Sequence, residues 1–559
     1  MTRKLIALTL ALMLTLSASA LAWDYHDFCQ YPLADGDVTV SVITLRNDVS
    51  GADVEDIWFW KWISQATGIN FEVEQVLNSA LNERKNLLFA SGDLPDLIYG
   101  FGLSTIDLVK YGQTEGMLMD LKPYITPEIM PNACQWMEEY PDAFAQATTP
   151  DGAIYSLPWL YGIKYIWGES SRFFYNEAVM KEIGIEEVPQ TLDGFVDLLY
   201  AVKEAYPDTY PLGGGYSVTS PIFYFLNALG FLGNADNNGL GITLREGEAV
   251  LPVGDPLYKE ILTLFRQFYE DGIISPDFFT LDSTQLNAAV MNEEVFAYVG
   301  PPFTVNSDYE FWSRWNSVYP LTSEYNSTQQ WLRYNPVSVG NVCISATSEH
   351  AELLCRVFDF LYSDVGTIMF WYGPMNGTED TLGMTEGWAI DENNGVYWPE
   401  CNDGTYENFM YYAYQVGCGV SGGGAGNHTY SLGQNGIPAD LGMYNVMRYL
   451  WGNETIAEDG YDPKSPSEGF RLQMQKTISP YEVNGFPGIV YYDEDTSYRM
   501  NELSVMLKDR MDAEVAKFIV GERDLEEFDS FVEELEALGL REYEEYFQDA
   551  YASYLESAA

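Results

Sequence analysis

Histidine and basic residues are scarce in this chain of 559 residues. It contains three histidines, and its 28 lysines and arginines stand against 83 aspartates and glutamates, for a formal net charge of −55. A histidine metal site needs clustered histidines, and neither a cluster nor an H-E-x-x-H motif is present. Binding to nucleic acid or to anionic membranes depends on lysine and arginine. The composition therefore argues against a histidine-bound metal, a nucleic-acid partner and an anionic membrane surface.

Cysteine is also rare, and it does not occur in metal or redox spacings. No C-x-x-C pair is present, which disfavours zinc-binding and thioredoxin-like chemistry. Six cysteines allow about 15 disulfide connectivities, and the sequence does not choose among them. Two of them, Cys343 and Cys355, lie in apolar surroundings and are expected to be buried thiols. Neither a Walker A loop nor a G-x-G-x-x-G motif after a strand is found, so we expect no cofactor and no bound metal. The six are Cys29, Cys134, Cys343, Cys355, Cys401 and Cys418.

Long apolar runs are missing except at the N-terminus. Arg3 and Lys4 precede an uncharged stretch over residues 5–16, and small residues with an Ala20-x-Ala22 pattern follow. This stretch is shorter than the roughly 20 residues of a membrane span, and the order of its parts is typical of a secretory signal. We predict a signal peptide over residues 1–22 and an extracytoplasmic protein, secreted or associated with the cell surface. The first cysteine, Cys29, follows Tyr-His-Asp-Phe, so we predict no lipid attachment there.

Hydrophobic residues make up 47% of the chain and aromatic residues 15%, which at this length is enough for two or more domains. Strand patterns over 38–44, 69–76 and 97–99 alternate with helix patterns over 56–67 and 79–90. This order predicts an α/β fold with a parallel sheet. Ligands of such sheets bind beyond the carboxyl ends of the strands, so the loops at 46–48 and 99–102 are expected on a ligand-facing rim.

Further strands and helices are expected along the rest of the chain. A strand is predicted over 173–175, and Thr191 is expected to cap a helix over 191–205 whose apolar residues form one stripe. Residues 376–488 are rich in glycine, asparagine, tyrosine and serine and predict an irregular insertion. Two acidic, periodic helices are predicted over 493–518 and 525–554. Other predicted elements include helices over 177–183, 256–271, 281–291 and 349–362, and strands over 295–299 and 339–345.

Residues 151–176 are unusually aromatic and are interrupted by proline and glycine. Leu157 precedes a proline and is therefore not expected to be helical. We predict that this stretch crosses between two lobes that close on a flat, partly polar ligand. A buried hairpin whose aromatic side chains only fill a core is the alternative, and the stretch alone does not decide between them.

Three weaker patterns could indicate chemistry. Gly419–Gly423 matches G-x-S-x-G, but glycines surround it where a nucleophile elbow needs a strand and a helix, so a loop is the better interpretation. Asn234–Gly239 resembles the start of a calcium loop, but its twelfth position is Arg245 where a glutamate is required, so a plain turn is favoured. A pair of carboxylates as used by glycosidases stays open, because the sequence does not give the distance between two acids.

Several segments together resemble the family-1 extracellular solute-binding proteins of ABC importers, in the large lipoprotein-like saccharide-binding branch. The match includes LLFASGDLPDLIY and, at the crossing, DGAIYSLP followed by FFYNEAVMKEIG. It continues through the helix at 191–205 and the return segment at 339–373, and is most specific in MDAEVAKFIVG and the C-terminal helices. The segments with quoted sequence are Leu87–Tyr99, Asp151–Pro158, Phe173–Gly184 and Met511–Gly521, and the C-terminal ones are 528–539 and 543–551.

The resemblance implies a type II periplasmic-binding-protein fold in which two α/β lobes, joined by a hinge, close over a solute. The solute is commonly a sugar or oligosaccharide, the partner is an ABC permease, and no catalysis is involved. Two features of the branch are absent, namely the lipid-attachment cysteine and the calcium-loop segment that some relatives have after the helix at 191–205. On this basis lobe 1 is expected over 37–157 and 335–375, and lobe 2 over 158–334 and 376–559.

Solute contacts are expected from aromatic residues at the rim and at the crossing, together with one acid that can accept hydrogen bonds from hydroxyl groups. These positions follow from loop placement and not from the family. We expect a monomer that binds a small-molecule solute. The predicted contacts are Asp48, Tyr99, Trp159, Trp167, Tyr216, Trp312 and Trp371.

Three other functions stay open. A secreted carbohydrate-active hydrolase would use a carboxylate pair and turn its ligand over. A peptide-binding transport protein would also suit aromatic residues and polar loops. A binding protein that feeds a membrane sensor, in place of a permease, would have the same fold.

Overall fold

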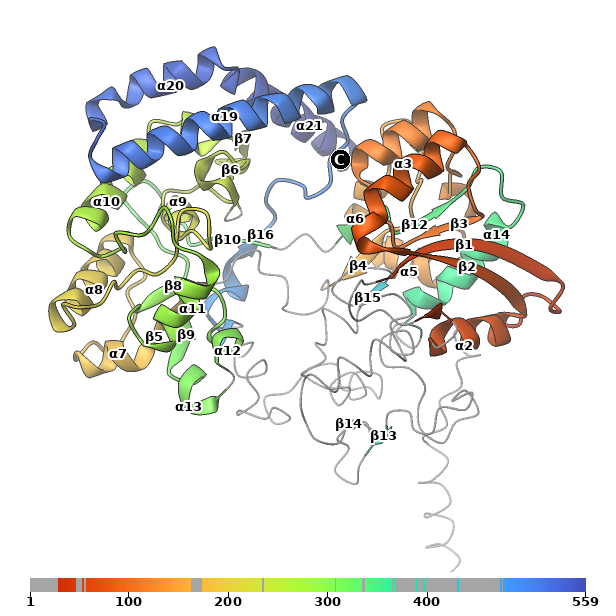
Figure 1. Ribbon diagram of the computed structural model, residues 1–559, viewed down its shortest axis with the longest axis horizontal. Helices are drawn as coiled ribbons and strands as arrows, with labels where there is room; N and C mark the ends of the chain where they lie inside the picture. Colours follow the sequence, from red (N-terminus) through yellow and green to blue (C-terminus); the bar gives the residue numbers. More distant parts are fainter. Residues whose placement is uncertain are drawn as a thin grey trace, which may run out of the picture.

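The described chain forms two lobes, each with its own hydrophobic core (Figure 1). The core of the first lobe consists of residues within 31–160 and 337–362, together with Ile489. The core of the second lobe consists of residues within 173–331 and 478–540. The structure is a computed structural model that describes residues 29–46, 53–54, 57–139, 141–161, 173–233, 236–306, 308–333, 337–363, 366, 389–390, 396–397, 430–431, 473–474 and 476–558.

The sheet of the first lobe has the strand order β12-β3-β1-β2. Its strands β1 (Val38–Arg46), β2 (Ile69–Leu77) and β3 (Leu97–Tyr99) are parallel, as the β-α-β-α-β order predicts. Crossover helices α2 (Trp58–Thr67) and α3 (Leu81–Ser91) connect them. Strand β12 (Val342–Ile344) returns from far along the chain and pairs antiparallel with β3.

Two further helices stabilise the first lobe through a buried carboxylate. Helix α14 (Ala351–Asp359) ends in Asp359, which is 4% exposed. The carboxylate accepts hydrogen bonds from the backbone N–H groups of Asn132 and Ala133 at 3.3 and 2.9 Å. Those residues begin α5 (Pro131–Glu139), which α6 (Pro141–Ala147) follows. The first turn of α5 is thereby capped by a side chain more than 220 residues away.

The second lobe contains a three-stranded sheet of order β8-β5-β9. Here β5 (Phe173–Asn176) pairs antiparallel with both β8 (Ala297–Val299) and β9 (Trp315–Ser317). The alternation of helices and strands predicted for this region is confirmed, but it builds an antiparallel sheet and not a parallel one. The helices around it are α7 (Glu177–Glu182), α8 (Leu192–Ala205), α9 (Ile222–Ala228), α10 (Tyr258–Glu270) and α11 (Ser283–Met291).

Three helices end the chain and pack on the second lobe (Figure 1). They are α19 (Glu494–Val520), α20 (Phe528–Ala537) and α21 (Leu540–Ala558). The prediction of one helix over 525–554 is wrong, because Gly539 adopts a φ of +104° between α20 and α21 and ends the first of them. Buried Glu514 and Arg523 form an ion pair at 2.7 Å, and Arg523 also pairs with Glu534 on α20 at 3.0 Å. This network holds α19 against α20.

No helix of the described residues is both long and apolar enough to cross a membrane. The other elements of the described chain are short. They are α4 (Thr105–Asp107), the π-helix η4 (Leu108–Thr114), η5 (Lys122–Tyr124), β4 (Trp159–Tyr161), η6 (Asp236–Gly239), β6 (Thr243–Arg245), β7 (Glu248–Val250), η7 (Pro252–Gly254), α12 (Pro302–Val305), α13 (Tyr309–Trp312), β10 (Trp331–Leu332), β11 (Val337–Ser338), β15 (Tyr430–Ser431), β16 (Glu482–Val483) and η14 (Leu525–Glu527), together with η3 (Asn78–Ala80), η8 (Phe360–Tyr362), β13 (Ala389–Ile390), β14 (Val396–Tyr397) and η13 (Ser479–Tyr481).

Candidate functional site

The connections between the lobes define the place where a solute-binding protein would bend. Strand β4 pairs with β11 and β15, whereas β5 belongs to the sheet of the second lobe. The hairpin interpretation of residues 151–176 is therefore wrong, and the stretch crosses between the lobes as predicted. Residues 162–172, with the centre of this crossing, lie outside the described residues. A second crossing joins β10 in the second lobe to β11 in the first.

A third segment reaches from the second lobe to the first and returns. Strand β16 pairs with β10, then Ile489 enters the core of the first lobe and Tyr491 packs against it. Asp493 then caps α19 by accepting a hydrogen bond from the backbone N–H of Thr496 at 2.7 Å. Just beyond, Glu494 forms an ion pair with Lys110 of the first lobe at 3.0 Å. The start of α19 is thus fixed against both lobes.

The structure places the seven predicted solute contacts as follows. Asp48, Trp167 and Trp371 lie outside the described residues. Tyr99 ends β3 with no exposed surface, and its ring meets Trp60 edge-on at 5.9 Å between centroids. Trp159 begins β4 and is 9% exposed.

The other two predicted contacts belong to the second lobe. Tyr216, in the loop before α9, is buried and donates a hydrogen bond to Asp512 at 2.9 Å. Trp312 ends α13, is buried and packs edge-on against Tyr309. The four described residues therefore lie on four separate segments, and each is buried, Tyr99 in the core of the first lobe and Tyr216 in that of the second. Their role as solute contacts stays a prediction.

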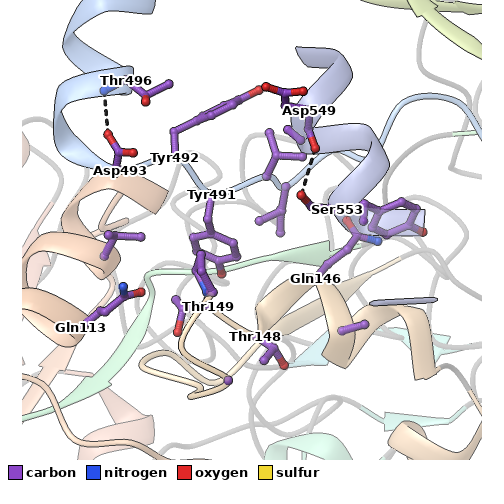
Figure 2. A pocket seen from close by; sticks show the side chains of 18 of the residues that line it. Gln113, Gln146, Thr148, Thr149, Tyr491, Tyr492, Asp493, Thr496, Asp549 and Ser553 are labelled. Carbon is purple, nitrogen blue, oxygen red and sulfur yellow. Dashed lines mark hydrogen bonds between the residues drawn. The ribbon is translucent and has the colours of Figure 1, made fainter. Parts of the chain in front are cut away.

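A large cavity lies where the first lobe meets the C-terminal helices (Figure 2). Its volume is about 970 Å³, within the range of small-molecule sites. One wall comes from η4, α6 and the loop after α6, and the other from residues 489–496 and α21. We call it the junction cavity. Its lining residues are Val109, Gln113, Lys122, Ala145, Gln146, Thr148, Thr149, Pro150, Gly152, Ile489, Val490, Tyr491, Tyr492, Asp493, Thr496, Tyr546, Asp549, Ala550, Ser553 and Tyr554.

Sequence reasoning missed every residue of the junction cavity. The nearest signal is the tyrosine pair Tyr491-Tyr492 immediately before Asp493, the N-cap of α19. Burial raises the pKa of both tyrosine hydroxyls above the ordinary value, so both stay protonated at neutral pH. Figure 2 shows Tyr491 pointing from its segment toward the loop of Thr148 and Thr149. A pair of tyrosines can supply hydrogen bonds and apolar ring faces together.

The segment that resembles a calcium loop takes part in packing where it is described. Asn238 donates a hydrogen bond from its side chain to the carbonyl oxygen of Tyr216 at 2.7 Å, and the hydroxyl of Tyr258 donates to the carbonyl oxygen of Asn238. Asn234 lies outside the described residues. Within the described part of the chain, no group of three histidine, cysteine or acidic side chains is arranged to hold a metal ion.

The cysteine prediction is confirmed for the two positions that it named. Cys343 and Cys355 are free, fully buried thiols, and burial raises the pKa of each to about 12. Cys134 is a further buried free thiol. Cys401, Cys418 and the G-x-S-x-G stretch lie outside the described residues. A thiolate nucleophile at Cys343 or Cys355 is disfavoured, because the raised pKa keeps the thiol protonated.

Known proteins share this architecture over nearly their whole length. A solved extracellular solute-binding protein from Bifidobacterium longum subsp. infantis has a TM-score of 0.71 at 18% identity, covering 93% of this chain and 99% of that one. The structure of the Streptococcus pneumoniae substrate-binding protein FusA in complex with kestose gives 0.62 at 20% identity, covering 93% and 99%. These likenesses, with the two cores and the crossings, define the fold as that of a two-lobed solute-binding protein.

Sequence comparison gives the family. The family described as bacterial extracellular solute-binding protein matches residues 51–368, more than half of the chain. The chain belongs to this family, which confirms the resemblance noted from its segments. It is also 24% identical over 543 residues to the fructooligosaccharide ABC transporter substrate-binding protein FusA of Streptococcus pneumoniae serotype 4, covering 92% of this chain and 90% of that protein. The name of FusA describes the substrate-binding protein of an ABC transporter.

Proposed function

We infer that this protein captures an oligosaccharide between its two lobes and delivers it to the permease of an ABC importer, without cleaving it. The observation that carries the proposal is the separation of the chain into two independent cores joined by crossing segments. The near full-length similarity to a fructooligosaccharide-binding protein supports the solute class. The proposal includes an extracytoplasmic monomer with a signal peptide over 1–22 and the predicted lobe boundaries.

Closure by the solute is energetically reasonable in this arrangement. The ion pair between Lys110 and Glu494 is the charged contact described between the first lobe and α19, and the two side chains are 30% and 41% exposed. Exposed ion pairs contribute about 0–1 kcal/mol. A solute bound with a micromolar Kd contributes about 8 kcal/mol. A solute that touches both lobes can therefore decide which arrangement of the lobes is populated.

The solute contacts proposed from loop position remain part of this function. Asp48 would accept hydrogen bonds from hydroxyl groups, and the ring faces of Trp159, Trp167 and Trp371 would stack on the apolar faces of sugar rings. The buried positions of Tyr99, Tyr216 and Trp312 suit a second role, in which they fix the walls of the site from behind.

Thermal unfolding against a panel of monosaccharides, oligosaccharides and peptides tests the proposal, with the ligands analysed after incubation. A specific ligand at one hundred times its Kd stabilises the protein by about 2.7 kcal/mol. We expect this stabilisation from an oligosaccharide that is recovered intact. Recovery of cleaved sugar would refute the proposal in favour of a hydrolase, and stabilisation by peptides alone would refute the solute class.

Delivery needs a separate measurement, because a sensor-feeding protein would bind the same solute. Membrane vesicles containing the cognate permease should take up the labelled oligosaccharide only when this protein is added. Solute binding without uptake, together with activation of a membrane kinase, would contradict the role in import.

A further inference from the structure

The third crossing segment between the lobes, residues 484–492, contains neither helix nor strand (Figure 1). It begins with Asn484-Gly485-Phe486-Pro487-Gly488, so that a glycine stands on each side of the Phe-Pro pair. Among the described residues, no backbone hydrogen bond holds this segment. Glycine permits a wide range of backbone angles, and backbone without hydrogen bonds opens easily. Local forces alone would therefore leave this crossing free to bend.

Helix α21 packs against the crossing segment and is anchored in the second lobe. Its buried Glu544 accepts a hydrogen bond from the backbone N–H of Leu251 at 2.9 Å. One turn further on, Gln548 donates to the carbonyl oxygen of Ala249 at 3.1 Å. The helix also reaches the first lobe, where it contacts α6. It is therefore a fixed support for the crossing segment.

An aromatic face of α21 holds the crossing segment. Tyr543, Phe547 and Tyr551 recur at four-residue spacing and so lie on one side of the helix. The ring of Phe486 meets Phe547 edge-on at 5.7 Å between centroids, and its centroid lies 5.7 Å from that of Tyr551. Further along the segment, Tyr492 meets Phe547 edge-on at 6.5 Å. Aromatic pairs of this kind stabilise a structure beyond their burial. The rings thus supply the order that the backbone of the crossing lacks.

The first lobe supports the crossing segment only over its later residues. Ile489 enters the core of the first lobe, and residues 489–493 border the junction cavity, so this part faces open space as well as the core. Phe486 precedes the residues that line the cavity and packs on α21. Its ring contacts therefore fix the segment at the point where the glycines leave the backbone free.

We propose that Phe486 is a positioning residue for solute binding: clamped by Phe547 and Tyr551, it stiffens the third crossing and limits the arrangements of the two lobes before the solute arrives. The inference rests on the proposed function and adds a residue that acts without touching the solute. A solute that bridges both lobes must order them, and a crossing that is already ordered reduces this entropic cost. Loss of the clamp therefore weakens the binding of every solute by the same factor, because the contacts in the site itself are unchanged.

Isothermal titration calorimetry with sucrose, kestose and nystose tests this effect. Phe486→Ala removes the clamped ring and should raise the Kd of each sugar that binds by one common factor of about ten, as expected when about one further residue is ordered on binding. Phe486→Tyr keeps the ring and should retain the affinity of the natural protein. An unchanged or lower Kd in Phe486→Ala would overturn the proposal. So would factors that differ among the sugars, since Phe486 would then contact the solute.

A second variant and a matched control separate the clamp from general stability. Tyr551→Ala removes the α21 side of the same contact, so adding it to Phe486→Ala should not weaken binding further. Phe71→Ala is the control, because this phenylalanine is also half-buried and its ring meets Trp60 edge-on at 5.9 Å within the first lobe. Phe71→Ala and Phe486→Ala should lower Tm alike, and only Phe486→Ala should change the Kd. An equal change in Kd from Phe71→Ala would overturn the proposal, since general loss of stability would explain both.

The freedom of the lobes is measured separately, in the protein without solute. Nitroxide labels attached through p-acetylphenylalanine at Asn86 of α3 and Glu204 of α8 report the distance between the lobes, because both positions are exposed and each lies on a different lobe. Double electron–electron resonance should give a broader distance distribution for Phe486→Ala than for the natural protein and for Phe71→Ala. Equal widths would overturn the proposal. If no sugar binds, the proposed transport of sugars fails, and this distribution still decides whether Phe486 restricts the lobes.

Discussion

Replacement of Asp359 by asparagine should change how the stability of the protein depends on pH. Burial raises the pKa of this carboxyl from 3.8 to about 6, against the opposing effect of hydrogen bonds from Ala133 and Asn132 and the charge of Arg356. Because the folded protein holds this proton more tightly than the unfolded chain, the contribution of Asp359 to stability is most favourable at low pH. It declines as the pH rises through 3.8 to about 6.

The magnitude follows from the size of the shift. One pKa unit corresponds to about 1.4 kcal/mol, so ionised Asp359 destabilises the fold by about 3 kcal/mol relative to its protonated form. Between pH 4.5 and pH 8, about 2 kcal/mol of this difference should be seen in the free energy of unfolding. Asparagine cannot titrate, and its single oxygen keeps only part of the hydrogen bonding to the first turn of α5. Asp359→Asn should therefore be less stable than the natural protein at pH 4.5 and should recover by about 2 kcal/mol, relative to it, at pH 8.

Urea unfolding at several pH values measures this difference, and the other carboxylates cancel because both proteins contain them. Asp142→Asn is the control, since it changes an exposed carboxylate in the first turn of the neighbouring helix α6. A difference between Asp359→Asn and the natural protein that stays constant from pH 4.5 to 8 would show that Asp359 does not titrate in this range, and would refute the argument from burial.

Two further predictions concern the backbone and the C-terminal helices. Gly340→Ala should destabilise the first lobe by about 2 kcal/mol more than Gly36→Ala. Both glycines have φ near +85°, but a Cβ on Gly340 would lie 1.9 Å from a carbonyl oxygen whereas one on Gly36 would meet nothing within 4 Å. Equal thermal stability of these two variants would contradict the steric argument. Glu514→Gln should cost about 2 kcal/mol in urea unfolding, because Glu514 is the buried one among the three acidic partners of buried Arg523. Glu527→Gln removes an exposed partner of the same guanidinium and should cost less than about 0.5 kcal/mol, so comparable losses would refute the role of burial.

Local patterns determined much of the first lobe. The β-branched stretch at 38–44, the helix stop at Gly68 and the order of elements predicted β1, α2 and β2 and their parallel pairing. Thr191 caps α8 as predicted, with Phe195, Leu198 and Leu199 buried. These features are decided by residues close together in the sequence, through side-chain periodicity and capping, and so they can be read before folding is known.

Contacts between distant residues were decided only by the tertiary structure. No local pattern shows that Asp359 caps α5 or that β5 pairs antiparallel with β8. The junction cavity is the clearest case, because its walls come from residues 109–152 and 489–554, which are more than 330 residues apart in the sequence. Phe486 and Phe547 are likewise ordinary aromatic residues of their own segments. Their rings meet only because the C-terminal helices pack along the third crossing segment, where burial of apolar surface favours the contact.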